Sequence, residues 1–113
     1  MIVEHQQDVT AKKVEMEGAK NVTIQWLIDD KRGASNFAMR RFVVGPGGHT
    51  PLHDHEWEHE IYVLEGRGAL VDENGEEHAL EPHRFGYVPA GETHQFKNVG
   101  SDDFVFLCMI PLQ

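Results

Sequence analysis

The sequence predicts a single all-β domain of the sandwich or barrel class. Its apolar residues mostly recur with a period of two, the strands that this implies are short, and turn residues separate them about every 8–12 residues. No stretch carries a helical apolar pattern over about 12 residues. A chain of 113 residues can bury one core and is too short for two, so we expect one domain.

The first strands follow from alternation and from the turns that end it. Residues 22–28 form one strand, with four apolar side chains on one face: Val22, Ile24, Trp26 and Ile28. Residues 37–44 form the next, and Gly45-Pro46-Gly47-Gly48 is expected to end it. Two short strands follow at 61–64 and 69–71, separated by a break at Gly66-Arg67-Gly68.

The second half of the chain has the same pattern. Asn74-Gly75 predicts a two-residue hairpin, because such turns need two residues of positive φ. Strands are then expected at 78–80, 85–88, 94–99 and 104–110, of which the last is the most apolar. Residues 1–20 are polar and are predicted to form an N-terminal arm leading into a barrel of residues 21–113.

Net charge and cysteine content limit the classes of partner and the cellular location that we expect. The chain has 10 Lys and Arg against 19 Asp and Glu, a net charge of −9, so we expect neither a nucleic acid nor a membrane surface as partner. One cysteine cannot form an internal disulfide. Residues 1–20 lack the pattern of a signal peptide, and no apolar run reaches about 18 residues. A cytoplasmic location is the expectation.

Eight histidines are the most informative feature, and four of them lie between His49 and His59. If residues 53–60 are extended, His53, His55 and His59 project from one face, whereas Glu60 and the other acids project from the opposite face. Imidazole suits Zn, Cu, Fe, Ni and related ions. The spacing therefore predicts a metal site; a solvated loop of mixed charge is the alternative.

Two motifs resemble those of the cupin superfamily. The pattern Gly47-x5-His53-x-His55-x3-His59-x6-Gly66 is similar to the first cupin motif, and Pro89-x-Gly91-x2-His94-x3-Asn98 to the end of the second. At the position where the second motif usually opens with glycine, this chain has His83. The resemblance implies a single-domain double-stranded β-helix, also called a jelly-roll barrel, with one metal inside.

The third ligand of the first motif departs from the usual cupin glutamate. Counting from His55 reaches either His59 or Glu60, and both the six-residue gap to Gly66 and strand parity select His59. The predicted ligands are therefore four histidines: His53, His55, His59 and His94. The stretches H-D-H-E-W-E-H-E-I-Y-V-L-E-G and F-L-C-M-I-P are similar to small manganese cupins with a four-histidine site. That resemblance favours Mn²⁺, with Fe²⁺, Ni²⁺, Cu²⁺ or Zn²⁺ as alternatives.

The resemblance also implies a pocket beside the metal. Phe104, Phe106 and Cys108 share one face of the last strand, which in cupins looks inward across from the motif histidines, so they are predicted pocket walls. Cys108 as an inert core thiol is the alternative. Arg40 and Arg41 differ in parity, and the resemblance selects Arg40 as an anion anchor; a surface pair is equally open.

These residues support two functions of different classes. Four neutral ligands leave the charge of a divalent ion uncompensated and leave two positions of an octahedral ion free for an anionic substrate. The first hypothesis is a metal-dependent oxidoreductase of dioxygenase type acting on a small organic molecule, with no catalytic residue assigned. The alternative is a non-catalytic cupin that binds a metal and a small ligand as a sensor or store. Exposed sheet edges and the polar arm predict a homodimer.

Overall fold

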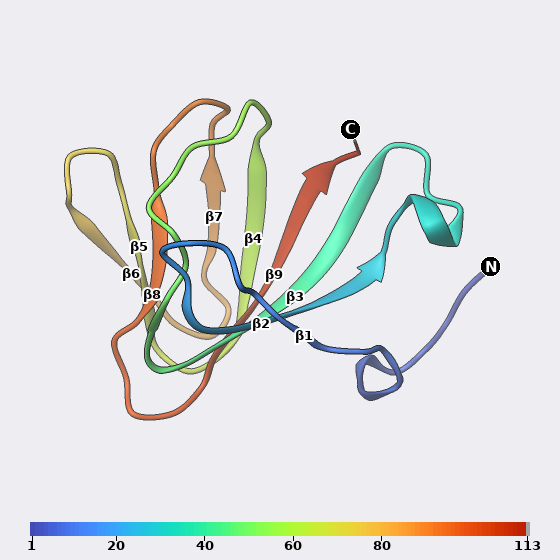
Figure 1. The fold of residues 1–113 in the computed structure, drawn as a ribbon, viewed down its shortest axis with the longest axis horizontal. Coiled ribbons are helices and arrows are strands. Elements are labelled where there is room, and N and C mark those ends of the chain that lie inside the picture. Colours follow the sequence, from blue (N-terminus) through green and yellow to red (C-terminus); the bar gives the residue numbers. More distant parts are fainter. Residues whose placement is uncertain (113) are drawn as a thin grey trace.

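Antiparallel strands wrap into a nearly closed barrel in the computed structural model, which describes residues 1–112 (Figure 1). The all-β prediction is confirmed, since the helical elements are two 3-10 turns, η1 (Gln6–Asp8) and η2 (Asp30–Arg32). The strands are β1 (Lys12–Lys13), β2 (Lys20–Ile28), β3 (Phe37–His49), β4 (His59–Glu65), β5 (Gly68–Val71), β6 (Glu77–Leu80), β7 (Phe85–Val88), β8 (Gln95–Asn98) and β9 (Phe104–Pro111). Among residues 1–112, no helix is long and apolar enough to cross a membrane.

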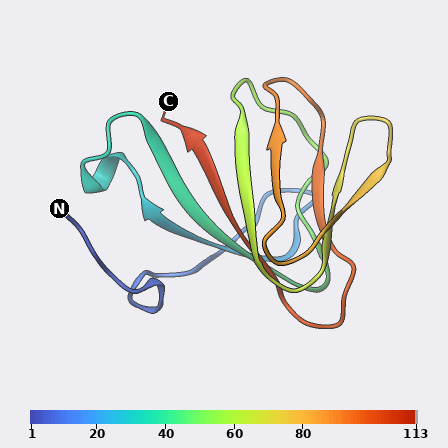
Figure 2. The same ribbon diagram turned by 180° about the vertical axis from the view of Figure 1, so that it is seen from behind.

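Strand β3 is the centre of the sheet. The strands follow the order β6-β5-β8-β3-β9-β4-β7, and β2 pairs with β3 as well. The first part of β3 pairs with β9, and its last residue, His49, pairs with Lys97 of β8. Figures 1 and 2 show β2, β3 and β9 running out on one side of the molecule and β5, β6 and β8 lying on the other.

The core lies inside the barrel and follows the predicted alternation. In β4 the side chains of His59, Ile61 and Val63 are buried, whereas those between them are exposed. The largest fully buried side chains are those of Phe104 and Phe106 on β9. The face of β4 that begins with His59 is thus the inner face, and this places the histidine in the barrel.

The glycine-rich segment after residue 44 does not end the second predicted strand. Residues 45–48 continue β3, because Lys20 of β2 pairs with His49 beyond a register shift. A Cβ atom on Gly48 would lie 2.6 Å from the carbonyl oxygen of Lys20, so glycine permits this close approach of two backbones. The prediction took these glycines as a turn, whereas they bend a continuing strand.

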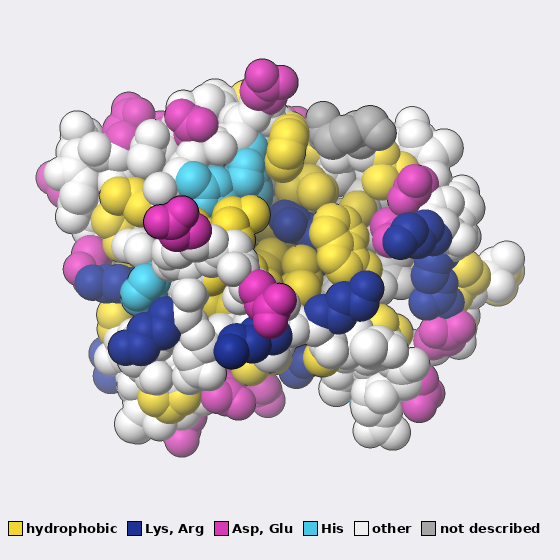
Figure 3. All heavy atoms as spheres, viewed as in Figure 1, with side chains coloured by type: hydrophobic (Ala, Val, Ile, Leu, Met, Phe, Trp, Pro, Cys, Tyr) yellow, Lys and Arg dark blue, Asp and Glu magenta, His cyan; other side chains and the backbone are white. Residues whose placement is uncertain are grey.

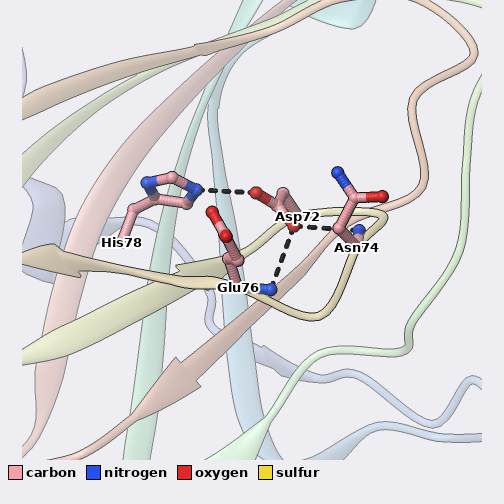
Figure 4. Close-up of polar contacts among 4 residues, drawn as sticks. All are labelled: Asp72, Asn74, Glu76 and His78. Atoms are coloured by element: carbon pink, nitrogen blue, oxygen red, sulfur yellow. Dashed lines mark hydrogen bonds and ion pairs between the residues drawn. The ribbon is translucent and has the colours of Figure 1, made fainter.

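The hairpin between β5 and β6 is longer than predicted. The Asp72 N–H donates to the Glu76 carbonyl at 2.9 Å, which leaves residues 73–75 in the loop, and Gly75 alone of these has a positive φ, 82°. Asp72 Oδ1 accepts the N–H groups of Asn74 and Glu76 at 2.9 and 3.0 Å (Figure 4). The Asp72 carboxylate therefore stabilises a three-residue loop in place of the two-residue turn.

The N-terminal arm packs along its own barrel. Lys12 of β1 pairs with Ile24 of β2. The buried Gln25 side chain donates to the Gln6 and Val9 carbonyls at 2.7 and 2.9 Å. These hydrogen bonds fix the arm across β2, beside the mouth of the cavity described below.

Substitution of Gly68 should destabilise the barrel severely. A Cβ at this position would fall against the ring of Phe104, which is completely buried. We expect Gly68→Ala to lower the free energy of unfolding by about 1–3 kcal/mol, as overpacking of a rigid core does. Urea unfolding would measure the change. Gly100→Ala is the matched control, since its nearest neighbour is an exposed side chain, that of Arg67; equal losses in both variants would contradict the steric account.

Candidate metal centre

Three segments of the chain bring four histidines together. His53 and His55 lie in the segment between β3 and β4, His59 is the first residue of β4, and His94 directly precedes β8. The backbones of His53 and His94 exchange two hydrogen bonds, of 3.1 and 3.0 Å. The two sequence motifs are therefore joined at the site by main-chain contacts.

The imidazole rings form one cluster. The Nε2 atoms of His53 and His55 are 2.6 Å apart, and one ligand nitrogen from each of His53, His55 and His94 lies within 4.8 Å of the others. The ring of His59 adjoins this group, with its centroid 4.8 Å from that of His55 and 5.0 Å from that of His94. Residues 53, 55 and 94 thus make a possible metal site, with His59 beside it.

The chain reaches this geometry without the extended segment that the sequence predicts. Residues 54–58 form no strand; only His53 makes a bridge, and β4 starts at His59. The exposure of the side chains nevertheless alternates along this segment. At its end, for example, Glu60 is exposed whereas His59 is only 4% exposed. The acidic side chains of this segment therefore face away from the ring cluster.

The nitrogen atoms available in the cluster fit a divalent transition metal. The Nδ1 of His94 lies 2.9 Å from the Glu92 carbonyl, which can only accept, so this nitrogen carries the proton and the Nε2 lone pair is free. The Nε2 of His59 is buried and has no hydrogen-bond partner among the described residues. Imidazole nitrogens suit Zn, Cu, Fe and Ni ions.

Burial keeps these rings neutral. Burial and then the neighbouring His53 and His94 lower the pKa of His55 to about 4. Burial, His94 and Arg40 lower the pKa of His59 to about 3. The pKa of His53 is also lowered, by burial first and His94 second. Neutral imidazole is the form that coordinates a metal, so these three rings are prepared for it at neutral pH.

A mostly apolar cavity of about 400 Å³ opens from the ring cluster, a size within the range of small-molecule sites. Its walls include Ile24, Trp26, Phe42 and Phe96, and residues 12–16 of the arm lie along one side. Figure 3 shows histidine side chains beside a hollow lined by hydrophobic side chains on this face. The cavity therefore joins the histidine cluster to a mostly apolar wall.

The predicted pocket residues divide into two groups. Arg40, Phe106 and Cys108 line the cavity. Phe104 does not: it is the first residue of β9, two before Phe106, and is fully buried in the core, with its ring centroid 5.1 Å from that of Phe106. Both residues lie on the inward face of β9, so alternation along the strand could not distinguish a residue of the cavity wall from one of the core beneath it. Arg41 points away from the cavity and donates to Gln25 at 3.0 Å.

Several wall residues were not predicted from the sequence. Trp26 pairs with Arg40 in the β2–β3 register, so knowledge of the strand pairing would have predicted that Trp26 lies in the cavity wall. Lys12 and Lys13 belong to the arm, and nothing in their polar context indicates that they reach the cavity. The Arg40 guanidinium lies 5.4 Å from the Trp26 ring centroid and 5.0 Å from that of Phe42, which places a cation within cation–π distance of two aromatic rings.

Comparison with protein families decides the family. A family model described as "Cupin domain" matches residues 40–110, more than half of the chain and both histidine motifs. The chain is a cupin. This cupin is also similar along its whole length to a solved structure, the polyketide cyclase RemF from Streptomyces resistomycificus, with 41% identity and a TM-score of 0.94, covering 100% of this chain and 80% of that one.

Two characterised relatives have other roles. The cupin is 31% identical over 109 residues to an oxalate-binding protein from Thermotoga maritima, a match that covers 93% of this chain and 89% of the relative. It is 37% identical over 73 residues to 1-methylthio-D-xylulose 5-phosphate methylsulfurylase from Rhodospirillum rubrum. That match spans 64% of this chain and 46% of the relative, so less than half of that enzyme is represented here. The family thus joins enzymes and binding proteins.

Proposed function

We propose that this cupin holds a divalent metal through His53, His55, His59 and His94 and is an enzyme that acts on a small enolisable carbonyl compound. Mn²⁺ is the favoured ion, with Fe²⁺, Ni²⁺, Cu²⁺ or Zn²⁺ as alternatives. The observation that carries the proposal is the content of the cavity, in which a cluster of neutral imidazoles and the cation of Arg40 share a mostly apolar wall. Such a site favours a conjugated molecule bound as its anion.

The charge of the cavity supports an anionic ligand. The Arg40 guanidinium makes no ion pair among the described residues, and its Nε is buried without a hydrogen-bond partner. The one carboxylate among the lining residues is that of Glu15, on the arm. Because neutral ligands leave a divalent ion with its full charge, both that ion and the Arg40 guanidinium would stabilise an enolate or phenolate oxygen.

The chain's own residues would bind and orient this anion. When bound, a divalent ion supplies Lewis-acid polarisation of the carbonyl oxygen. Arg40 would donate hydrogen bonds to an oxyanion, in a position that Trp26 and Phe42 fix by stacking. The rings of Phe42 and Phe106, whose centroids are 5.2 Å apart, would exclude water and pack on a planar ligand.

Cyclisation of a polycarbonyl compound is the first candidate reaction. Its support is the similarity to a polyketide cyclase over the whole chain, together with a cavity large enough for a folded ligand. The dioxygenase-type oxidoreductase that the sequence favours is the second candidate. The scarcity of carboxylates in the cavity favours it, since oxygenation of an already ionised enol needs no base from the protein.

Product analysis under air separates these candidates. Metal-loaded protein would be incubated with poly-β-ketones, β-diketones and catechols, with oxygen uptake and product mass recorded and His59→Ala as control. Cyclisation predicts a ring product that has lost water, with no oxygen consumed. Gain of two oxygen atoms with matching uptake would replace the cyclase by a dioxygenase. Tight binding without turnover would overturn both and favour the non-catalytic role that the oxalate-binding relative suggests.

Arg40 should set the affinity for anionic ligands. We expect Arg40→Met to raise the Kd of an enolate ligand about 10–100-fold, because a charge-assisted hydrogen bond contributes roughly 1.5–3 kcal/mol. The Kd of a neutral aromatic ligand should change little. Isothermal titration would measure both, and Arg41→Met is the matched control, since Arg41 contacts Gln25 outside the cavity. An equal loss for both kinds of ligand would contradict an anion anchor.

We also propose the homodimer that the sequence predicts, formed through the outer face of β4 and β7. Phe85 is 80% exposed on β7, a strand at one end of the sheet order, and it pairs with the exposed Tyr62 of β4. Such apolar area at a sheet edge favours association. Sedimentation at micromolar concentration should give twice the 12.8 kDa chain mass, and Phe85→Lys should give the single chain. A monomeric wild type would contradict the dimer.

A further inference from the structure

We infer that Cys108 is a positioning residue for His59: its sulfur accepts the Nδ1–H of His59 and an N–H of Arg40, and thereby directs the His59 Nε2 lone pair into the cavity. The inference rests on the proposed metal site for its consequence, although the hydrogen bonds themselves do not need the metal. It concerns a residue outside both histidine motifs.

Three adjacent strands bring the groups together. Cys108 lies on β9, where it pairs with Arg40 of β3 on one side and with Ile61 of β4 on the other. His59 is two residues before Ile61 and faces the same way. The sulfur is 3.3 Å from His59 Nδ1 and 2.9 Å from Arg40 Nη2, and Cys108 is only 1% exposed.

The direction of the hydrogen bonds follows from which groups can donate. A guanidinium has donors only, so the sulfur is the acceptor from Arg40. If His59 carried its proton on Nε2, a buried N–H would have no acceptor among the described residues. With the proton on Nδ1, the ring donates to the sulfur and leaves only a lone pair at Nε2. This second tautomer avoids an unsatisfied buried donor, whose cost is about 1–3 kcal/mol.

The chemical consequence is a ligand whose tautomer and ring orientation are fixed. A histidine that binds a metal ordinarily donates its other N–H to a carboxylate, a carbonyl or water, and this contact fixes the tautomer and the ring orientation. In this chain the sulfur of Cys108, which is only 1% exposed, takes that place and holds the His59 ring from the wall of the barrel.

The tautomer can be measured in the metal-free wild type. Long-range ¹H–¹⁵N correlation spectra at neutral pH distinguish the protonated from the unprotonated ring nitrogen. We expect a protonated Nδ1 and an unprotonated Nε2 for His59. A protonated Nε2 would overturn the inference, whether or not any variant folds.

Variants then test the consequence for metal binding, with Mn²⁺ affinity measured from the electron paramagnetic resonance signal of the free ion. Cys108→Ala should weaken Mn²⁺ binding about 10–100-fold, as loss of such a partner ordinarily does. Cys108→Ser, which keeps an acceptor, should recover most of this loss. Ile110→Val, a packing change on the same face of β9, should leave the affinity within about threefold of wild type.

Affinities of Cys108→Ala and Cys108→Ser that fall equally, or only in proportion to lost thermal stability, would overturn the inference in favour of a packing role. A wild type that shows the expected tautomer and binds neither Mn²⁺ nor Fe²⁺, Ni²⁺, Cu²⁺ or Zn²⁺ would support the hydrogen bond and overturn the proposed metal site. The two failures are therefore distinguishable.

Discussion

His59→Ala should lose metal binding, whereas Glu60→Gln should keep it. His59 is buried beside the other rings with its Nε2 free of any described hydrogen-bond partner, and Glu60 is exposed on the opposite face of β4. We expect the alanine variant to bind Mn²⁺ more than about 100-fold more weakly, beyond the 10–100-fold loss that removal of a supporting contact causes. Equilibrium dialysis with elemental analysis would measure this.

Glu60→Gln is the matched control because it changes the neighbouring side chain without altering its size. Its metal content should equal that of the wild type. The reverse pattern, with metal lost from the glutamine variant and kept by the alanine variant, would mean that the chain uses the carboxylate usual in this motif.

Metal removal should lower the melting temperature by about 15–30 °C. An ion present at about 1,000 times its Kd stabilises the folded state by roughly 4 kcal/mol, and each kcal/mol corresponds to about 4–8 °C in a domain near this size. Scanning calorimetry with and without a chelator would measure the difference. A melting temperature that is independent of the chelator would contradict a metal bound in the barrel.

The lowered pKa values determine how the difference in melting temperature between the metal-bound and metal-free protein depends on pH. An unfolded histidine has a pKa of about 6.5, whereas the folded values are about 4 for His55 and about 3 for His59. As the pH falls below 6.5, the unfolded chain takes up protons that neither folded form binds at these two residues. Both forms therefore lose stability together, with their melting temperatures falling in parallel.

Proton competition at His55 and His59 begins only when the metal-free folded chain protonates them, near pH 4 and below. The stabilisation by metal should thus survive acidification to about pH 5 far better than four ordinary imidazoles would allow. Calorimetry of both forms between neutral pH and that value checks this. A difference that collapses already near pH 6 would contradict the lowered pKa values.

Periodicity and turn residues were enough to predict the strands β2 to β9 along the chain, although not the short β1 or the order of the strands in the sheet. They located β4 and β9 within one or two residues, because one face of each strand is buried and the alternation is regular. The conformation of the turns was harder to predict from the sequence. The Asp72 carboxylate selects a longer loop than Asn74-Gly75 alone suggests, and pairing with Lys20 keeps the glycines of β3 in a strand. Both effects depend on contacts that the local sequence does not contain.

The cluster of histidine rings was predictable because chemistry and spacing coincide there. The histidine motifs contain four rings that the fold gathers, although residues 54–58 bend rather than extend. The cavity was harder to predict because it is formed by strands and an arm distant in sequence. Phe104 and Phe106 have the same parity, and only their depth in the barrel separates core from cavity wall.

X-ray absorption spectroscopy of the metal-loaded protein tests the four-histidine centre most directly, because multiple scattering from imidazole rings counts the histidines around the ion. We expect four imidazoles, with the remaining positions filled by oxygen ligands and no sulfur. Three or fewer imidazoles, or a first shell made of carboxylate oxygens, would contradict the four-histidine centre.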